Sequence, residues 1–301
     1  RTTAVGLCGS DLHWLSEAAI GDADLGHPLV LGHEFAGVIE GGERVAVDPA
    51  IACGACEFCQ EGNPNLCIAL RFAGHGKEDG ALREYAAWPR RCLHHLPNAL
   101  TDVDGVMLEP LGVAIHAVDL GHITPGMTVG VLGCGPIGLL VLQVARVAGA
   151  ACLVATEKLP HRLDAARSLG AMAFQADGGQ ESAEILAATG GRGVDVAFDA
   201  TEDNGAVEAA IAVVKPGGRV VLVGIPTGER TAFTASVARR KGLTIKLTRR
   251  MKHTYPRAIR LVERGLVDVR SLVTHRFPLA VFDQAFFVAQ RRDGLKVIIE
   301  P

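Results

Sequence analysis

The sequence of 301 residues is poor in aromatic side chains, which make up 5% of it, and it has no long basic run. Its longest basic clusters, Arg239–Lys241 and Arg249–Lys252, are short, and the formal net charge is −3. Proteins that bind nucleic acid usually carry an extended basic patch, so we expect no polyanionic partner. No apolar run reaches the roughly 18–20 residues that cross a bilayer, so we expect no membrane partner either.

The cysteines do not form the pattern of a small disulfide scaffold, because there are eight of them in a long chain. Four lie close together in the sequence, and the other four lie far apart: Cys8, Cys92, Cys134 and Cys152. This usage fits a reduced, cytoplasmic protein.

The pattern of strands and helices changes along the chain, and its length favours two domains. Residues 1–116 show short strands, frequent turn residues and no sustained helical period. In residues 117–248, continuous apolar strands alternate with helices, which is typical of a parallel sheet covered on both faces. We therefore predict an α/β fold with a doubly wound domain in this range. Residues 249–301 are too few for a further domain, and we expect them to pack on the first one.

A glycine pattern follows the first strand of the doubly wound region. In "GVLGCGPIG", Gly133, Gly135 and Gly138 form G-x-G-x-x-G where a strand leads into a helix, with Pro136 and Ile137 at the start of the helix. This context indicates a dinucleotide site, in which the backbone approaches a pyrophosphate at the start of the helix.

An acidic residue is expected at the end of the second strand, where Glu157 stands. A carboxylate there accepts hydrogen bonds from ribose hydroxyls and repels a 2′-phosphate, so the sequence favours NAD over NADP. Three residues at the ends of later predicted strands also belong to the candidate cofactor set: Thr201, Val223 and Gly224. In the alternative interpretation, the glycines only turn the chain and Glu157 is a surface residue.

The clustered cysteines follow the pattern C-x2-C-x2-C-x7-C and consist of Cys53, Cys56, Cys59 and Cys67. Four thiolates suit a structural zinc ion whose tetrahedral shell leaves no place for substrate. An iron–sulfur cluster, a thioredoxin-like C-x-x-C pair and free cysteines are the alternatives.

A second group of possible ligands is spread over three motifs. Cys8 stands in "LCGSDLH", His33 and Glu34 stand in "LGHEF", and Glu109 stands in "MLEPLGVAIH". Each of these residues is weak evidence for a metal site on its own. An unpaired carboxylate in the apolar surroundings of Glu109 would, however, cost free energy, so a partner for Glu109 is expected. A catalytic metal needs a few such ligands and one open position.

These motifs occur together in the order "CGSDLH", "GHEFAG", the four cysteines, "EPLGVAIHA" and "GCGPIG". The chain thereby resembles the zinc-dependent medium-chain dehydrogenases, and "EPLGVAIH" and "LVTHRFPL" resemble their sorbitol and related polyol branch. The resemblance implies a GroES-like domain with two zinc sites (1–116), a Rossmann domain that binds NAD (117–248) and a returning C-terminal segment (249–301). It also implies a homo-tetramer, with a dimer as the alternative.

The resemblance also implies roles for individual residues. Cys8, His33 and Glu34 would bind the catalytic zinc, and Glu109 would complete the site directly or through water. A proton relay would use Ser10, with His13 in the same motif. Arg162 would approach the adenosine ribose, and Arg250 matches a substrate-side arginine, although "RRMKHTYP" departs from the usual aromatic-rich version.

The implied reaction transfers a hydride between NAD and a secondary alcohol or its ketone, with a polyol such as sorbitol or xylitol as substrate. The alternatives are the same chemistry on L-threonine or a simple secondary alcohol, and a non-enzymatic dinucleotide-binding homologue. The chain starts at Arg1, and "VIEGGERVAV" is a short join for this family. We therefore expect that residues are missing at the N-terminus and at this join.

Overall fold

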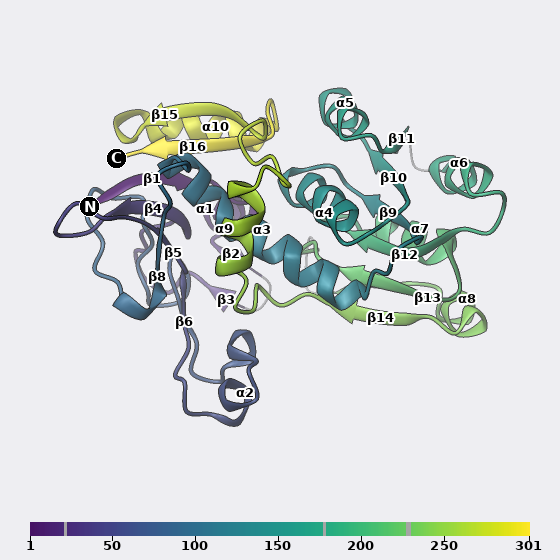
Figure 1. Cartoon of the computed structure of the whole chain (residues 1–301), viewed down its shortest axis with the longest axis horizontal. Coiled ribbons are helices and arrows are strands. Elements are labelled where there is room, and N and C mark those ends of the chain that lie inside the picture. Colours follow the sequence, from purple (N-terminus) through teal and green to yellow (C-terminus); the bar gives the residue numbers. More distant parts are fainter. Residues whose placement is uncertain (21–22, 177–178, 227–229) are drawn as a thin grey trace. The chain divides into compact units, whose positions relative to one another are not determined.

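The chain divides into two compact units in the computed structural model, which describes residues 1–20, 23–176, 179–226 and 230–301. Unit 1 consists of Arg1–Gly112 and Met251–Pro301, and unit 2 consists of Val113–Arg250. Figure 1 labels their helices and strands. None of the helices in these described ranges is long and apolar enough to span a bilayer.

Unit 1 is built on a six-stranded sheet in which the last strand of the chain lies beside the first. The strand order is β15 (Val273–Pro278), β16 (Lys296–Glu300), β1 (Thr2–Gly6), β4 (Glu34–Val38), β5 (Arg44–Val47) and β8 (Leu93–His95). Strands β1 and β16 are antiparallel, with Val5 opposite Ile299. The C-terminal residues therefore complete the sheet that the N-terminal residues begin.

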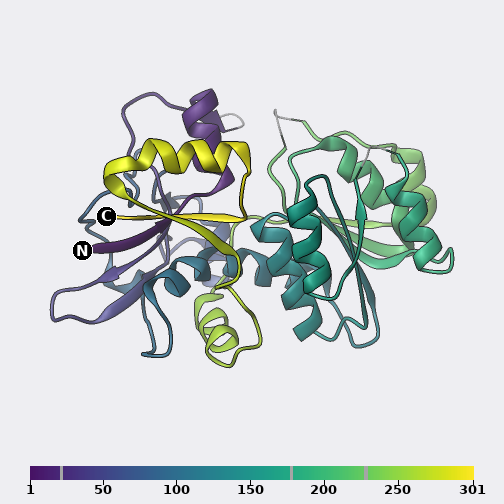
Figure 2. The same cartoon turned by 90° about the horizontal axis from the view of Figure 1, so that it is seen from above.

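Among the described residues of unit 1, two small sheets and four complete helices accompany this sheet. The small sheets pair β2 (Ala19–Ile20) with β3 (Ala23–Asp24) and β6 (Ala50–Ile51) with β7 (Arg71–Phe72). The helices are α1 (Gly9–Glu17), α2 (Glu57–Gln60), α9 (Tyr255–Glu263) and α10 (Phe282–Arg291). Figure 2 shows α10, in yellow, running along the C-terminal strands, where Phe286 packs with Val297 and Ile299.

The expectation that residues 1–116 lack a sustained helix is wrong. Helix α3 covers Asp102–Gly121, and α1 covers Gly9–Glu17. Residues 106–111 of α3 are all buried, so the helix lacks the polar face that makes a helical period visible in a sequence. Pro110 inside the helix and several glycines further weaken the local signal.

Unit 2 is the predicted parallel sheet, and the α/β fold class is confirmed. The strand order is β11 (Met172–Gln175), β10 (Cys152–Glu157), β9 (Thr128–Leu132), β12 (Val194–Asp199), β13 (Val214–Leu222) and β14 (Thr244–Leu247). All neighbouring pairs are parallel. The helices between them are α4 (Pro136–Val147), α5 (Pro160–Ser168), α6 (Glu181–Ala188), α7 (Asn204–Val213) and α8 (Ala235–Lys241).

The order of these strands fixes where a ligand can bind in unit 2. The chain runs outward from β9 through β10 to β11 and then returns to β12 on the other side of β9. In open parallel sheets, ligands bind at the carboxyl ends of the strands where the order reverses in this way. The glycine turn after β9 lies at this reversal point.

Helix α4, which follows the glycine turn, has clear start and stop signals. Pro136 occupies its first turn, where a missing N–H costs nothing. At its end, Gly149 donates to the carbonyl of Arg146 and Ala150 donates to that of Ala145, which is the Schellman arrangement. Leu139, Leu140 and Leu142 are buried, so the helix is anchored to the sheet by apolar contact.

Asp195 ties together the amino ends of three neighbouring strands of unit 2. Its carboxylate contacts Lys215 Nζ at 2.7 Å and accepts a hydrogen bond from the N–H of Thr128 at 2.9 Å. Arg192 Nη2 also lies 2.7 Å from Asp195 Oδ1. Arg192 first, and then Lys215 and the N–H of Thr128, hold the pKa of Asp195 well below its ordinary value.

Replacing Asp195 with Asn should lower the free energy of unfolding by about 1–2 kcal/mol at pH 7, because charge-assisted hydrogen bonds are lost. The loss is no larger because part of the site is exposed to solvent, which weakens its ion pairs. Because the fold lowers the pKa of Asp195, its carboxylate stabilises the protein fully at any pH above the ordinary aspartate pKa of 3.8. This stabilisation is lost as the pH falls through the lowered pKa of the folded protein. Urea unfolding at several pH values measures it.

The control is Asp164→Asn, which removes an exposed partner of Arg167 and should change stability by less than about 0.5 kcal/mol. A difference between Asp195→Asn and the parent that grows on acidification would contradict this account.

Candidate active site and metal centres

Three predicted zinc ligands meet in unit 1. Cys8 caps the start of α1, His33 precedes β4, and Glu34 is the first residue of β4. One ligand atom from each lies within 4.8 Å of those of the other two. Cys8 is partly exposed, whereas His33 and Glu34 are buried. A thiolate, an imidazole and a carboxylate at this spacing fit the donor chemistry of zinc.

Asp11 joins the elements that carry these ligands. It is fully buried, and its carboxylate accepts the N–H of Cys8 at 2.9 Å and that of Gly32 at 3.1 Å. The same carboxylate lies 3.5 Å from Nδ1 of His33. A carboxylate behind a metal-binding histidine fixes the orientation and tautomer of its ring.

Asp11 and His33 shift the pKa of one another. Burial alone would raise the pKa of Asp11, but His33 and the N–H groups of Cys8 and Gly32 lower it. Burial alone would lower the pKa of His33, but the charge of Asp11 raises it well above its ordinary value. The Asp11 carboxylate is therefore ionised beside the imidazole.

Glu34 is held from its other side by Lys296 of strand β16. The ammonium group contacts the Glu34 carboxylate, and both side chains are buried. Burial alone would lower the pKa of Lys296, but the charges of Glu34, Cys8 and Glu109 raise it. An ion pair at this depth stabilises the site only because each charge has a partner.

Glu109 lies on α3 and is buried, but it is outside the group of three close ligand atoms. Burial raises the pKa of Glu109 to about 7, with His33 lowering it and Glu34 raising it. These electrostatic effects connect Glu109 to the other ligands. Its direct or water-mediated binding of zinc stays a prediction.

Ser10 and His13 both lie on α1, next to Cys8. Ser10 is in the first turn of the helix and is partly exposed. His13 Nδ1 lies 3.0 Å from Oε1 of Glu17, and the His13 side chain is mostly covered. The helix thus places both proposed relay residues within two turns of Cys8.

The four cysteines form a second cluster, with their sulfur atoms within 4.8 Å of one another. Figure 1 shows the lobe around α2 standing away from the large sheet of unit 1. The N–H groups of Ala55 and Cys56 donate to Sγ of Cys53 and lower the pKa of that thiol to about 6. The arrangement fits a structural zinc ion with a closed thiolate shell.

The glycine turn of unit 2 packs closely against its neighbours. A Cβ atom on Gly138 would lie 1.9 Å from the carbonyl oxygen of Gly133, so only glycine lets α4 approach the end of β9. The predicted cofactor residues Gly133 and Gly135 lie in the turn between β9 and α4, and Pro136, Ile137 and Gly138 lie in the first turn of α4. On Gly135, a Cβ would meet the tip of Arg162 at 3.5 Å and, apart from its chain neighbours, no other described residue within 4 Å, so the backbone here is approachable by a ligand.

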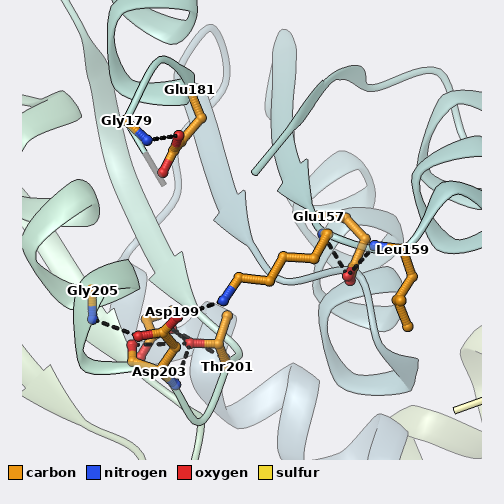
Figure 3. A network of polar contacts seen from close by, with 9 residues as sticks. Glu157, Leu159, Gly179, Glu181, Asp199, Thr201, Asp203 and Gly205 are labelled. Atoms are coloured by element: carbon orange, nitrogen blue, oxygen red, sulfur yellow. Dashed lines mark hydrogen bonds and ion pairs between the residues drawn. The ribbon is translucent and has the colours of Figure 1, made fainter. Parts of the chain in front are cut away.

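Three other predicted cofactor residues gather at the same edge of the sheet. The N–H groups of Val223 and Gly224 donate to the carbonyl of Asp199 at the end of β12. Thr201 Oγ1 donates to Asp199 Oδ1 at 2.8 Å, as Figure 3 shows. A Cβ on Gly224 would lie 1.6 Å from the carbonyl oxygen of Thr201, so the two loops are in close contact.

Glu157 lies at the expected place, at the end of β10, and its carboxylate binds backbone groups. Oε2 accepts the N–H of Cys134 in the glycine turn at 2.7 Å. Oε1 accepts the N–H groups of Lys158 at 2.7 Å and Leu159 at 3.0 Å. The Glu157 carboxylate therefore holds the glycine turn in place through Cys134. The expected hydrogen bonds from a ribose to Glu157 stay a prediction.

Arg250 is the last residue of unit 2 and has a left-handed backbone, with φ of 54°. Its predicted contact with substrate stays a prediction.

Three buried charged residues that contact predicted site residues were missed by the sequence reasoning. Asp11 stands in the same motif as Cys8. A carboxylate three residues after a proposed zinc ligand could have been recognised as a group that supports the metal site. Asp199 ends a buried strand, and burial raises its pKa to about 6. Lys296 gave no signal, because only the pairing of β16 with β1 brings it to Glu34.

Two family models match successive parts of the chain. Residues 1–98 match the alcohol dehydrogenase GroES-like domain, and residues 136–264 match the zinc-binding dehydrogenase family. The chain is 33% identical to the sorbitol dehydrogenase of Bacillus subtilis, over 100% of this chain and 89% of that protein. It is 37% identical to a probable D-xylulose reductase A of Aspergillus terreus, over 98% and 88%.

Solved structures of dehydrogenases superpose on the whole length of this chain. A proposed zinc-binding dehydrogenase of Sinorhizobium meliloti, bound to NADP, has a TM-score of 0.88 and 32% identity, covering 100% of this chain and 91% of that one. A short chain alcohol dehydrogenase of Escherichia coli CFT073, complexed with NADH, has a TM-score of 0.90 and 30% identity, covering 100% and 90%.

The fold and the donor groups therefore define a zinc-dependent oxidoreductase that uses a nicotinamide dinucleotide. The chain belongs to the zinc-dependent medium-chain dehydrogenase family, in its polyol dehydrogenase branch. The family recognised from the sequence motifs is confirmed.

Replacing Asp11 with Asn should weaken zinc binding at the Cys8 centre roughly 10- to 100-fold, the usual cost of losing a carboxylate behind a ligating histidine. The asparagine NH₂ would also face one of the two N–H groups that now donate to the carboxylate, so that hydrogen bond would be lost. Competition with a chelator, followed by metal analysis, measures the affinity.

Glu17→Gln is the matched control. Like Asp11, Glu17 is a carboxylate of α1 that contacts a histidine, here His13, but it is half exposed. It should keep the parent's zinc affinity. An Asp11→Asn protein with unchanged affinity would show that Asp11 does not position His33.

Replacing Cys56 with Ser should remove the zinc of the four-cysteine cluster and lower the melting temperature, by roughly 5–10 °C if the lobe loses a few kcal/mol. Differential scanning calorimetry together with zinc analysis checks this. Cys152→Ala, outside the cluster, should keep the zinc content of the parent. If Cys56→Ser abolished turnover at full stability, the cluster would be catalytic.

Proposed function

We propose that this chain catalyses the reversible oxidation of a secondary alcohol of the polyol class, such as sorbitol or xylitol, with NAD⁺ as hydride acceptor. The observation that carries this proposal is the meeting of Cys8, His33 and Glu34 in unit 1 of a chain whose unit 2 is a dinucleotide-binding fold. The relatives named as sorbitol dehydrogenase and D-xylulose reductase support a polyol substrate.

The catalytic groups have distinct tasks. When bound, zinc would act as a Lewis acid that lowers the pKa of the alcohol hydroxyl. Cys8, His33 and Glu34 would hold the metal, with Asp11 and Lys296 fixing the side chains of His33 and Glu34. Glu109 would bind the metal directly or through water.

The proton of the alcohol would leave through the hydroxyl oxygen of Ser10, on the helix that Cys8 caps, toward His13. Alternatively, the proton would leave through a water molecule held by Glu109, which is buried on α3. Arg250 would contact the polar substrate.

The dinucleotide would bind at the carboxyl edge of the sheet in unit 2. The turn from Gly133 to Gly138 would receive the pyrophosphate at the start of α4, and Arg162 would approach the adenosine ribose. Thr201, Val223 and Gly224 would line the other side of the reversal point. Glu157 would accept the ribose hydroxyls, which favours NAD over NADP.

We further propose two zinc ions per chain, the second in the four-cysteine lobe, and a cytoplasmic homo-tetramer. Residues 1–116 would be the catalytic domain, 117–248 the NAD domain and 249–301 the segment that returns to the catalytic domain. A non-enzymatic homologue would be expected to have lost ligands of the catalytic zinc, and here all of these positions carry donor groups.

The test of substrate class is an NAD⁺ reduction screen over sorbitol, xylitol, ribitol, threitol, L-threonine and 2,3-butanediol, with NADP⁺ as cofactor control. Turnover confined to polyols with NAD⁺ is the expected result. Turnover of L-threonine or 2,3-butanediol alone would contradict the polyol assignment, and equal rates with both cofactors would contradict the role of Glu157.

Replacing His33 with Ala should reduce turnover by at least about three orders of magnitude, because the catalytic metal loses a ligand. NADH binding, measured by fluorescence titration, should stay within about twofold, since the dinucleotide fold of unit 2 is untouched. Retention of most of the activity would show that His33 does not bind the catalytic zinc.

A further inference from the structure

Lys158 and Asp203 form an ion pair at the edge of unit 2 where the dinucleotide is proposed to bind. Lys158 Nζ lies 2.7 Å from Oδ2 of Asp203. Lys158 directly follows the last residue of β10, and Asp203 lies four residues after the end of β12. Since β9 lies between these strands, the pair extends across the carboxyl end of β9.

The position of Lys158 matters for the choice between NAD and NADP. It is the residue next to Glu157, whose carboxylate is expected beside the 2′ position of the adenosine ribose. A cation at this place attracts a 2′-phosphate, which NADP carries and NAD lacks. An unpaired Lys158 would therefore oppose the discrimination that Glu157 provides.

Asp203 is held in position to neutralise this lysine. Its Oδ1 accepts the N–H of Gly205 at 2.8 Å, so Asp203 is the N-cap of α7. Its own N–H donates to Oγ1 of Thr201 at 3.1 Å, and Figure 3 shows these contacts. The hydrogen bond from Lys158 is the first cause of the lowered pKa of Asp203, which is thus ionised at neutral pH.

Glu157 and Arg162, the charged site residues on either side of Lys158, have contacts of their own. Glu157 already accepts three backbone N–H groups from the turn and from residues 158–159. Arg162 lies toward the glycine turn, with Nη1 3.5 Å from the Cβ position of Gly135. The carboxylate of Asp203, in contrast, lies within ion-pair distance of Lys158 Nζ.

We propose that Asp203 is a specificity-determining residue for the dinucleotide: by pairing with Lys158, it withholds that cation from a 2′-phosphate. The preference for NAD then depends on Asp203 together with Glu157. This inference rests on the proposed dinucleotide site.

The test is the variant Asp203→Asn in the full-length, zinc-loaded chain. Asparagine is as good an N-cap as aspartate, so α7 keeps its cap while Lys158 loses its charged partner. The dissociation constants of NADH and NADPH are measured by fluorescence titration at one ionic strength. We expect the ratio of NADPH to NADH affinity to rise about fivefold, which corresponds to about 1 kcal/mol for an exposed ion pair.

A double-mutant cycle shows whether the effect passes through Lys158. In a Lys158→Met background, Asp203→Asn should change the affinity ratio by less than about twofold. Asp293→Asn, which removes an exposed carboxylate paired with Arg291 in unit 1, controls for the change in net charge and should leave the ratio unaltered.

The outcomes separate this inference from the proposed function. If the parent binds NADH but the ratio does not rise in Asp203→Asn, or rises equally in the Lys158→Met background, the role of Asp203 is overturned and the dinucleotide site stands. If the parent binds neither dinucleotide, the proposed site itself is overturned, and this inference with it.

Discussion

The buried carboxylate of Asp11 is the group on which the geometry of the proposed catalytic centre depends. It binds the backbone on either side of the metal site, at Cys8 and Gly32, and it lies beside the ring of His33. A buried carboxylate is costly unless it is fully paired, so the start of α1 and the chain before β4 are held in one arrangement. Glu34 is fixed in the same way by Lys296, which joins the end of the chain to this centre.

The dinucleotide-binding unit depends instead on close backbone packing. Gly138 and Gly224 stand where any Cβ would collide with a neighbouring carbonyl oxygen, so the loops after β9, β12 and β13 meet at one edge. Charged side chains then complete that edge, with Glu157 bound to the glycine turn and Lys158 paired with Asp203. The two units thus use different means to hold their groups in place: paired buried charges in one and glycine contacts in the other.

Much of this arrangement was predictable, because the features concerned leave local patterns. Continuous apolar strands and the glycine motif predicted the parallel sheet, and the cysteine spacing predicted the lobe around α2. Helix α3 was missed because burial on all sides removes its amphipathic period. Lys296 and Asp203 were missed because their partners are distant in the sequence and meet them only through strand order.

The central claim is that Cys8, His33 and Glu34 collect a zinc ion that is distinct from that of the four cysteines. The most direct measurement is a crystal structure of the zinc-loaded protein with anomalous diffraction recorded at the zinc absorption edge. The account predicts two anomalous peaks per chain, one bound by Cys8 and His33 and the other by the four sulfur atoms. A single peak among the four cysteines, with none near Cys8, would contradict it.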